Sequence, residues 1–312
     1  MLSINRRIID KTKRLLWGFT GEGIVFKIGV YFLLTLIGFV YLYPLFYMVT
    51  YSFMNTEDLI NPLITYIPSG LFWDNFERAA SVMDYINTLW KTVLASFVPA
   101  VVQTVSAAVI GYGFARFRIP GKSILFALVL ATFIIPPQIT MIPQFLMFKD
   151  LGLIGSLFSY VFPAALGQGL KSGLFILIFY QFFRSIPKAL EEAAQIDGAG
   201  AYRIFAFICV PMAVPAIIIS FLFSMVWYWN ETLLAALYLG KELTTLPLEL
   251  QNFAVTYQKM FPVDPNAQTG RSLNEAINMA GTFMNIIPLL IVYFLMQRWF
   301  VESIERSGIT GE

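Results

Sequence analysis

The 312-residue chain contains no histidine, and its one cysteine, Cys209, has no second cysteine with which to form an internal disulfide. These absences exclude histidine-ligated haem, zinc sites built from His and Cys, and a cysteine–histidine nucleophile. The sequence also lacks a phosphate-binding loop of the form Gly-x-x-x-x-Gly-Lys-Ser/Thr. Any ATP chemistry must therefore come from another protein.

Charged residues are scarce as well. They make up only 13% of the chain, whereas 58% is hydrophobic and the mean hydropathy is +0.70. A soluble domain carries about 25% charged residues, so this composition excludes an ordinary soluble protein and indicates contact with membrane lipid, as do the 30 Phe and 15 Tyr. The net charge of +2 is too small to indicate a nucleic-acid partner.

Six apolar runs are each long enough to cross a bilayer, which takes about 20 mostly apolar residues in a helix. They lie near residues 28–53, 89–115, 123–147, 157–181, 211–238 and 277–300. The first run is too long for the apolar part of a cleaved secretory signal, and no small-residue cleavage site follows it. The sequence therefore predicts an all-α, polytopic membrane protein with six transmembrane helices.

Positive charge is distributed unevenly among the connections between these runs. Fourteen of the 21 Lys and Arg residues fall in the two tails and in the second and fourth connections. Cytoplasmic segments are enriched in Lys and Arg, so both termini are expected in the cytoplasm. The predicted parts are a cytoplasmic tail (1–27), a first helix with an outer loop (28–88), a transmembrane domain (89–300) and a second cytoplasmic tail (301–312).

Two outer connections, residues 54–88 and 239–276, are long and rich in Pro, Asn and aromatic residues. This composition predicts folded rather than disordered loops. The second connection begins with a candidate short amphipathic helix at residues 243–253.

The fourth connection, at residues 185–211, has more structure than a simple link requires. Pro187 suits the first turn of a helix, and Gly198 can adopt the left-handed conformation that stops one. A short helix, a bend and a second helix are therefore expected. Ala193 and Ala194 leave one face of the first helix shallow, so that another protein can approach its backbone closely.

The same connection carries a spaced motif. Glu192-Ala193-Ala194 is followed at fixed offsets by Gly198, Ile208 and Val210-Pro211. This pattern resembles the EAA loop of ATP-binding-cassette importer permeases, although Val210 replaces the usual Leu. The resemblance implies that the first helix docks in a cleft of an ATPase subunit, with Glu192 facing a basic group there. The residues expected to couple the chain to that ATPase are Glu192, Ala193, Ala194, Asp197, Gly198 and Pro211.

Further segments resemble the carbohydrate group of these permeases, in particular the second permease subunit of maltose-type importers. They are Asp74-Asn75-Phe76, residues 115–122 (Ala-Arg-Phe-Arg-Ile-Pro-Gly-Lys), Ile135-Pro136-Pro137-Gln138, Trp229-Asn230-Glu231 and Thr245-Leu246-Pro247-Leu248. The similarity runs from about residue 30 to the C-terminus. It implies a type I importer permease core that carries an oligosaccharide or related sugar and is not itself an enzyme.

The resemblance also implies partners: a second homologous permease in a heterodimer, two ATPase subunits and an extracytoplasmic solute-binding protein, in a bacterial or archaeal inner membrane. It implies no cofactor in this chain, because ATP and Mg²⁺ would be bound by the ATPase. Residues near 254–272 are expected to contact the solute-binding protein. The alternative is that they form a cap packed over the chain's own helices.

Lys171 is a charged residue within the fourth apolar run, where ionisable groups are expensive and mark functional candidates. It follows Gln168 in a stretch, residues 167–173, in which glycine and serine interrupt the apolar pattern. Broken helices often line a cavity. The alternative is that the fourth helix begins after Gly169, so that Lys171 extends to the outer membrane surface.

An aromatic and polar cluster closes the fifth run: Trp227, Tyr228, Trp229, Asn230 and Glu231. Aromatic faces stack on sugar rings, and amide or carboxylate groups bind hydroxyls, so the cluster is a candidate sugar path together with Gln168 and Lys171. The alternative is an aromatic belt at the membrane surface. Direct pairing of Glu231 with Lys171 is not expected, because the two lie at different helical depths.

Two other classes of protein are less consistent with the sequence. A stand-alone ion-coupled transporter usually places several acidic residues deep in its spans, and here only Glu231 qualifies. An integral-membrane enzyme would need a catalytic set, and the spans contain neither His nor an acidic pair.

Overall fold

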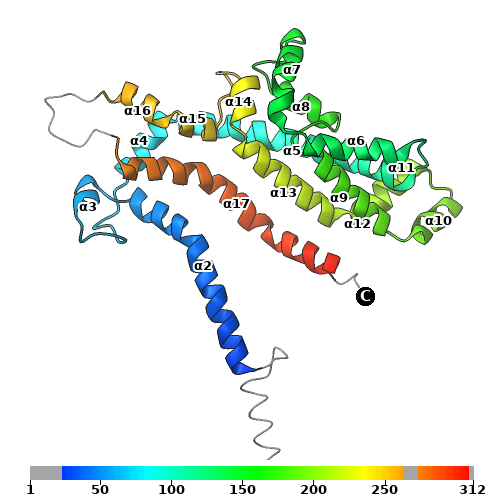
Figure 1. The fold of residues 1–312 in the computed structure, drawn as a ribbon, viewed down its shortest axis with the longest axis horizontal. Coiled ribbons are helices and arrows are strands. Elements are labelled where there is room, and N and C mark those ends of the chain that lie inside the picture. The colour runs from blue at the N-terminus through cyan, green and yellow to red at the C-terminus, as the bar shows by residue number, and fades with distance from the viewer. Residues whose placement is uncertain (1–22, 263–272, 309–312) are drawn as a thin grey trace, which may run out of the picture. The chain divides into compact units, whose positions relative to one another are not determined.

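The computed structural model describes residues 23–262 and 273–308, with side chains up to residue 299. Most of the predicted N-terminal tail, part of the expected docking segment at 263–272 and residues 309–312 lie outside this range. Every regular element within it is a helix (Figure 1). The chain divides into two units, one formed by residues 1–75 and 274–283, the other by 76–273 and 284–312. The long helix α17 (Glu275–Gly308) belongs in part to each.

The first unit contains α2 (Ile24–Ser52) and α3 (Thr56–Ile60). Apolar side chains cover all sides of α2, and most are exposed, as suits a helix that faces lipid. Its C-terminal end is held by Asn75, whose buried amide donates to the carbonyl oxygens of Ser52 and Met54 at 3.0 and 2.8 Å. Asn75 thus satisfies backbone groups that a helix end leaves open. The prediction that this connection is folded is confirmed.

The second unit is built around α5 (Tyr85–Arg116), which packs against α8 (Phe158–Ala165), α9 (Ser172–Ser185) and α13 (Val214–Asn230) (Figure 1). Small residues on α5 allow this close approach, including Ala100, Ala107 and Gly111, all buried. At Gly111, a Cβ atom would lie 2.6 Å from Phe179 Cβ and 3.0 Å from the backbone nitrogen of Tyr180 on α9. Backbone packing of α5 on α9 therefore depends on glycine at this position.

Shorter helices complete this unit. They are α4 (Asp74–Val82), α6 (Lys122–Ile134), α7 (Pro137–Asp150), α10 (Lys188–Ile196), α11 (Ala201–Ile204), the π-helix η1 (Phe205–Cys209), α12 (Val210–Met212), α14 (Leu233–Tyr238), α15 (Leu246–Gln251) and α16 (Phe253–Met260). The helix expected at 243–253 appears as α15, in which Leu246 and Pro247 are buried. A second helix, α16, follows it, with Phe253 and Tyr257 buried and Val255 and Met260 exposed.

Three of the predicted spans are broken. The run at 123–147 is bent by 97° between α6 and α7, at Ile135-Pro136, where proline cannot continue the hydrogen-bond ladder. The run at 211–238 is interrupted before Leu233. Among the described residues, α2, α5 and Glu275–Trp299 of α17 are long and apolar enough to cross a membrane. Three bent pairs, α6 with α7, α9 with α10 and Ala201–Met212 with α13, would raise the number to six if each were one span.

The third break, between α8 and α9, was expected from the sequence. Its backbone groups are satisfied by side chains of α5 and α13: Gln103 Nε2 donates to the carbonyl of Leu170 at 2.7 Å, and the amide of Leu170 donates to Tyr228 Oη at 3.2 Å. Tyr228 Oη in turn donates to Gln103 Oε1 at 2.8 Å. In a hydrocarbon environment such substitutes for helical hydrogen bonds are required. They hold the break in one conformation.

The packing of α5 predicts different outcomes for two glycines one half-turn apart. Gly111→Ala would force α5 away from α9 and is expected to destabilise the protein by about 1–3 kcal/mol. Gly113→Ala is the matched control, because a Cβ atom there meets nothing within 4 Å, and alanine favours a helix by up to ~1 kcal/mol over glycine. Thermal unfolding of the two purified variants in detergent compares them. Equal melting temperatures would contradict the packing argument.

Candidate functional site

A cavity of about 360 Å³ lies where the three helix breaks meet. Its walls come from the α6–α7 bend (Phe133, Ile135, Pro137), the α8–α9 break (Gln168 to Gly173) and the end of α13. Six of the seven residues predicted for a sugar path line it: Gln168, Lys171, Trp227, Tyr228, Asn230 and Glu231.

Trp229 departs from the prediction. It is 2% exposed and does not line the cavity. Consecutive residues on a helix are rotated by about 100°, from 3.6 residues per turn, so neighbours in one aromatic run cannot all face the same space. Trp229 is a packing residue in this structure, whereas Trp227 lines the cavity and packs on Phe175 with ring centroids 5.3 Å apart.

Most hydroxyl groups around the cavity already have an acceptor. Thr132 and Ser159 donate to carbonyl oxygens three residues earlier in the chain, and Tyr238 donates toward Met141 and Gln144. The side-chain oxygens of Tyr160 and Ser172 are the exception, since both are buried and have no hydrogen-bond partner in the described structure. A buried polar atom without a partner costs free energy, which a bound polar ligand or water would recover.

Lys171 and Glu231 give the cavity one charge of each sign. Lys171 adopts a left-handed conformation with φ of 58° just before α9, and its Nζ lies 5.4 Å from the centre of the Phe133 ring. Glu231 Oε1 accepts from the amide of Leu234 at 2.9 Å, at the start of α14. Both line one cavity, although no ion pair joins these two described residues. The helix does begin after Gly169, as one alternative predicted, and Lys171 still lines the cavity.

The loop at 185–211 forms a second candidate surface. The expected helix, bend and second helix are present as α10, Gly198 with φ of 80°, and α11. Glu192, Ala193 and Asp197 are exposed, and Ala194 is half-buried. Several large apolar side chains nearby also face outward, and exposed apolar groups of this kind mark interaction sites. They are Leu190, Ile196, Tyr202 and Phe207.

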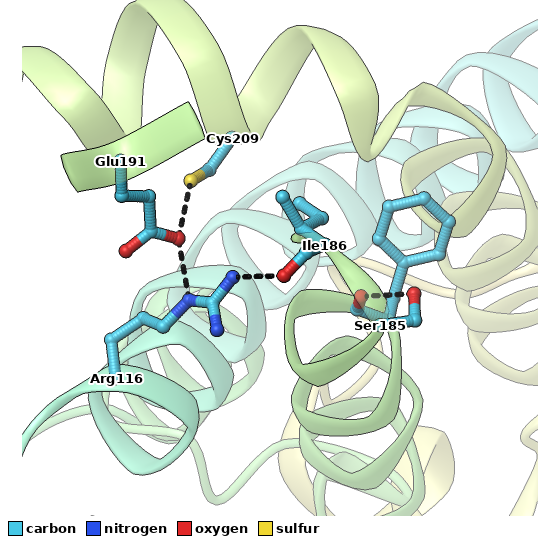
Figure 2. A network of polar contacts seen from close by, with 6 residues as sticks. Arg116, Ser185, Ile186, Glu191 and Cys209 are labelled. Carbon is cyan, nitrogen blue, oxygen red and sulfur yellow. Dashed lines mark hydrogen bonds and ion pairs between the residues drawn. The ribbon is translucent and has the colours of Figure 1, made fainter. Parts of the chain in front are cut away.

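One functional element of this loop was missed at the sequence level. Glu191 is the buried residue of α10, and its Oε1 forms an ion pair with Arg116 Nε at 2.5 Å (Figure 2). Arg116 Nη2 also donates to the carbonyl of Ile186 at 2.8 Å. Helical periodicity contained a signal: Glu191 and Glu192 are adjacent and must point in different directions, so an exposed Glu192 implies a Glu191 that turns toward another face.

Within the described residues, no group of three or more His, Cys, Asp or Glu side chains could hold a metal ion. The two candidate sites are the cavity, which has both polar and apolar walls, and the exposed face of α10, which the Arg116–Glu191 ion pair holds on the rest of the chain.

Comparison with known proteins identifies the chain. Residues 107–306 match the family model described as binding-protein-dependent transport system inner membrane component. The chain is 32% identical over 246 residues to the osmoprotective compounds uptake permease protein GgtD of Synechocystis sp., covering 79% of this chain and 76% of that protein. It is 27% identical to the polygalacturonan/rhamnogalacturonan transport system permease protein YtcP of Bacillus subtilis, covering 92% of this chain and 99% of that protein.

A solved structure agrees with these sequence matches. The crystal structure of a bacterial ABC transporter involved in the import of the acidic polysaccharide alginate contains a chain with a TM-score of 0.70 and 25% identity, covering 88% of this chain and 96% of that one. The all-α, multi-pass fold expected from the sequence is confirmed. The chain belongs to the inner membrane components of binding-protein-dependent transport systems and is a permease subunit of an ABC importer, not an enzyme.

Proposed function

We propose that this permease forms half of the translocation path for an oligosaccharide or related sugar and that the cavity is part of that path. The observation that carries the proposal is the cavity itself. Trp227 and Phe133 offer aromatic faces for a sugar ring, while Tyr160 and Ser172 offer buried oxygens without partners. Relatives whose names include polygalacturonan and alginate transport support this substrate class. A volume of about 360 Å³ is within the range of small-molecule pockets.

The proposed complex contains a second, homologous permease, two ATPase subunits and an extracytoplasmic solute-binding protein in a bacterial or archaeal cell membrane. ATP and Mg²⁺ would be bound by the ATPase. The exposed face of α10, with Glu192 and Ala193, would dock in the ATPase. The exposed side of α16, with Val255 and Met260, would begin the surface for the binding protein, while Phe253 and Tyr257 hold that helix on the chain.

If the cavity is part of the sugar path, removing the charge of Lys171 should lower uptake, whereas removing a lysine charge away from the cavity should not. Lys171→Gln removes the only cationic side chain that lines the cavity in the described structure. Uptake is expected to fall by about 10- to 150-fold, the equivalent of one charge-assisted hydrogen bond of roughly 1.5–3 kcal/mol. Lys149→Gln is the control, because Lys149 is an exposed residue in the last turn of α7 that does not line the cavity. Uptake of labelled neutral and uronate-containing oligosaccharides into cells is measured. Equal uptake by both variants would remove Lys171 from the path.

The proposed topology has six spans and both termini in the cytoplasm, so that α10 would lie inside the cell and residue 63 outside. In a Cys209→Ser background, Leu63→Cys should react with an impermeant thiol reagent in intact cells, and Ile196→Cys should react only after lysis. Both positions are highly exposed, at 91% and 87%, so access within the chain does not limit the reaction. The opposite labelling pattern would overturn the orientation.

The coupling proposal concerns the bend after α10. Gly198→Val would force a β-branched residue into the left-handed region, at a cost of roughly 1–2 kcal/mol, and should misplace α10 relative to α11. Gly200→Val is the matched control, since Gly200 has φ of −75° and ψ of 166°, an extended conformation that valine accepts. Only the Gly198 variant should lose uptake at normal expression.

Glu192→Lys tests the docking face of α10 independently, because it would place like charges across the docking surface. It is also expected to abolish uptake. Normal uptake by both Gly198→Val and Glu192→Lys would refute the role of this loop.

A further inference from the structure

The coupling helix α10 is attached to the rest of the chain by a polar contact. Glu191 is the buried residue among its nine, and Ala194 adds a half-buried contact with the apolar core. A short amphipathic helix normally anchors itself with large apolar side chains. Here Leu190 and Ile196 are exposed instead, at 45% and 87%. The carboxylate of Glu191 therefore makes the main contact that holds α10 on the chain.

The partner of that carboxylate is the last residue of α5. Arg116 has a side chain only 8% exposed, and it contacts two points at once: Glu191 on α10 through Nε, and the carbonyl of Ile186 at the end of α9 through Nη2 (Figure 2). An arginine suits this geometry because its rigid planar group presents several donors. The junction between α9 and α10 is therefore held on α5 at two positions.

A third element joins the same carboxylate. The thiol of Cys209, at the end of the π-helix η1, donates to Glu191 Oε1 at 3.6 Å. π-Helical turns are rare, occur mostly as single turns within α-helices, and are frequent at functional sites. The network thus connects α5, α10 and the segment that leads into α13.

The surroundings of this network are apolar. Tyr112, Phe183 and Phe205 pack ring against ring beside it, with centroids 4.8 to 6.1 Å apart. Burying two charges in such a place gives little net stability, and two well-packed apolar side chains are often as stable or more so. What the ion pair provides and an apolar pair does not is a fixed, directional connection.

We propose that Arg116 and Glu191 are positioning residues that make α10 and the inner end of α5 move as one body when the ATPase subunits close. This proposal rests on the assignment of α10 as the coupling helix. Displacement of α10 would pull α5 along through the ion pair. Since α5 also holds the α8–α9 break through Gln103, the displacement would reach the cavity.

The test uses the assembled transporter in lipid nanodiscs and needs no transported substrate. Spin labels at Gln195→Cys on α10 and Arg118→Cys beyond α5, in a Cys209→Ser background, report the distance between the two elements with and without ATP and vanadate. With Arg116 and Glu191 intact, this distance should stay constant on trapping. In Arg116→Met/Glu191→Leu it should shift by about 2 Å or more, the scale of helix shifts in such transitions.

If Arg116 and Glu191 only stabilise the fold, the distance measurement gives a different result. The apolar double variant would then restore the contact, and the distance would stay constant as in the parent protein, which would overturn the proposal. A parent distance that itself shifts on trapping would overturn it too. If the double variant does not assemble with the ATPase, Glu191→Met decides in its place, because methionine has a similar length and no oxygen that could accept from Arg116. A constant distance in Glu191→Met would also overturn the proposal.

The coupling assignment fails separately from this proposal. Normal uptake by both Gly198→Val and Glu192→Lys would refute α10 as the coupling helix. Lost uptake in Glu192→Lys together with a constant distance in the ion-pair variants would refute only the mechanical role of Arg116 and Glu191.

Discussion

Backbone hydrogen bonding in a medium without water is the constraint on which this structure depends. A helix satisfies its own amides and carbonyls, so a membrane protein can interrupt one only where other groups replace the lost bonds. The break between α8 and α9 is closed by Gln103 and Tyr228, and Ser106 Oγ adds a bond to the carbonyl of Ala164 at 2.5 Å. The interruptions at Ile135 and Glu231 border the same cavity. The position of the cavity therefore follows from the places at which these helices can end.

The central helix α5 connects this cavity with the loop at 185–211. Gln103 binds the carbonyl of Leu170 just before α9 begins, and Arg116 binds the carbonyl of Ile186 just after α9 ends. Thirteen positions separate the two side chains along an unbroken helix, a span of roughly 20 Å at 1.5 Å per residue. Close packing at Gly111 lies between them. α5 thus holds α9 at both ends and in the middle, which favours rigid displacement of the pair over bending.

Sequence reasoning was most accurate where backbone chemistry is local. Gly198 was expected to be left-handed, and the interruption at 167–173 was expected from its glycines; both are confirmed. The same reasoning erred where the outcome depends on neighbours. The 97° bend after α6 was missed, although Pro136 and Pro137 stood in an apparently continuous apolar run. Trp229 was grouped with a sugar path because composition alone does not tell which side of a helix faces a cavity.

The contrast between Glu191 and Glu192 shows why the coupling loop could be only half predicted. The motif marks Glu192, which is exposed, whereas Glu191 contacts Arg116, a residue 75 positions earlier in the same chain. Nothing in local spacing reveals that pairing. The two acids differ in their surroundings, since Glu192 lies on the exposed side of α10 and Glu191 on the side held against the rest of the chain. The proposed docking of α10 needs both sides. Apolar packing is non-directional, whereas the ion pair with Arg116 is directional and fixes the side on which α10 is held.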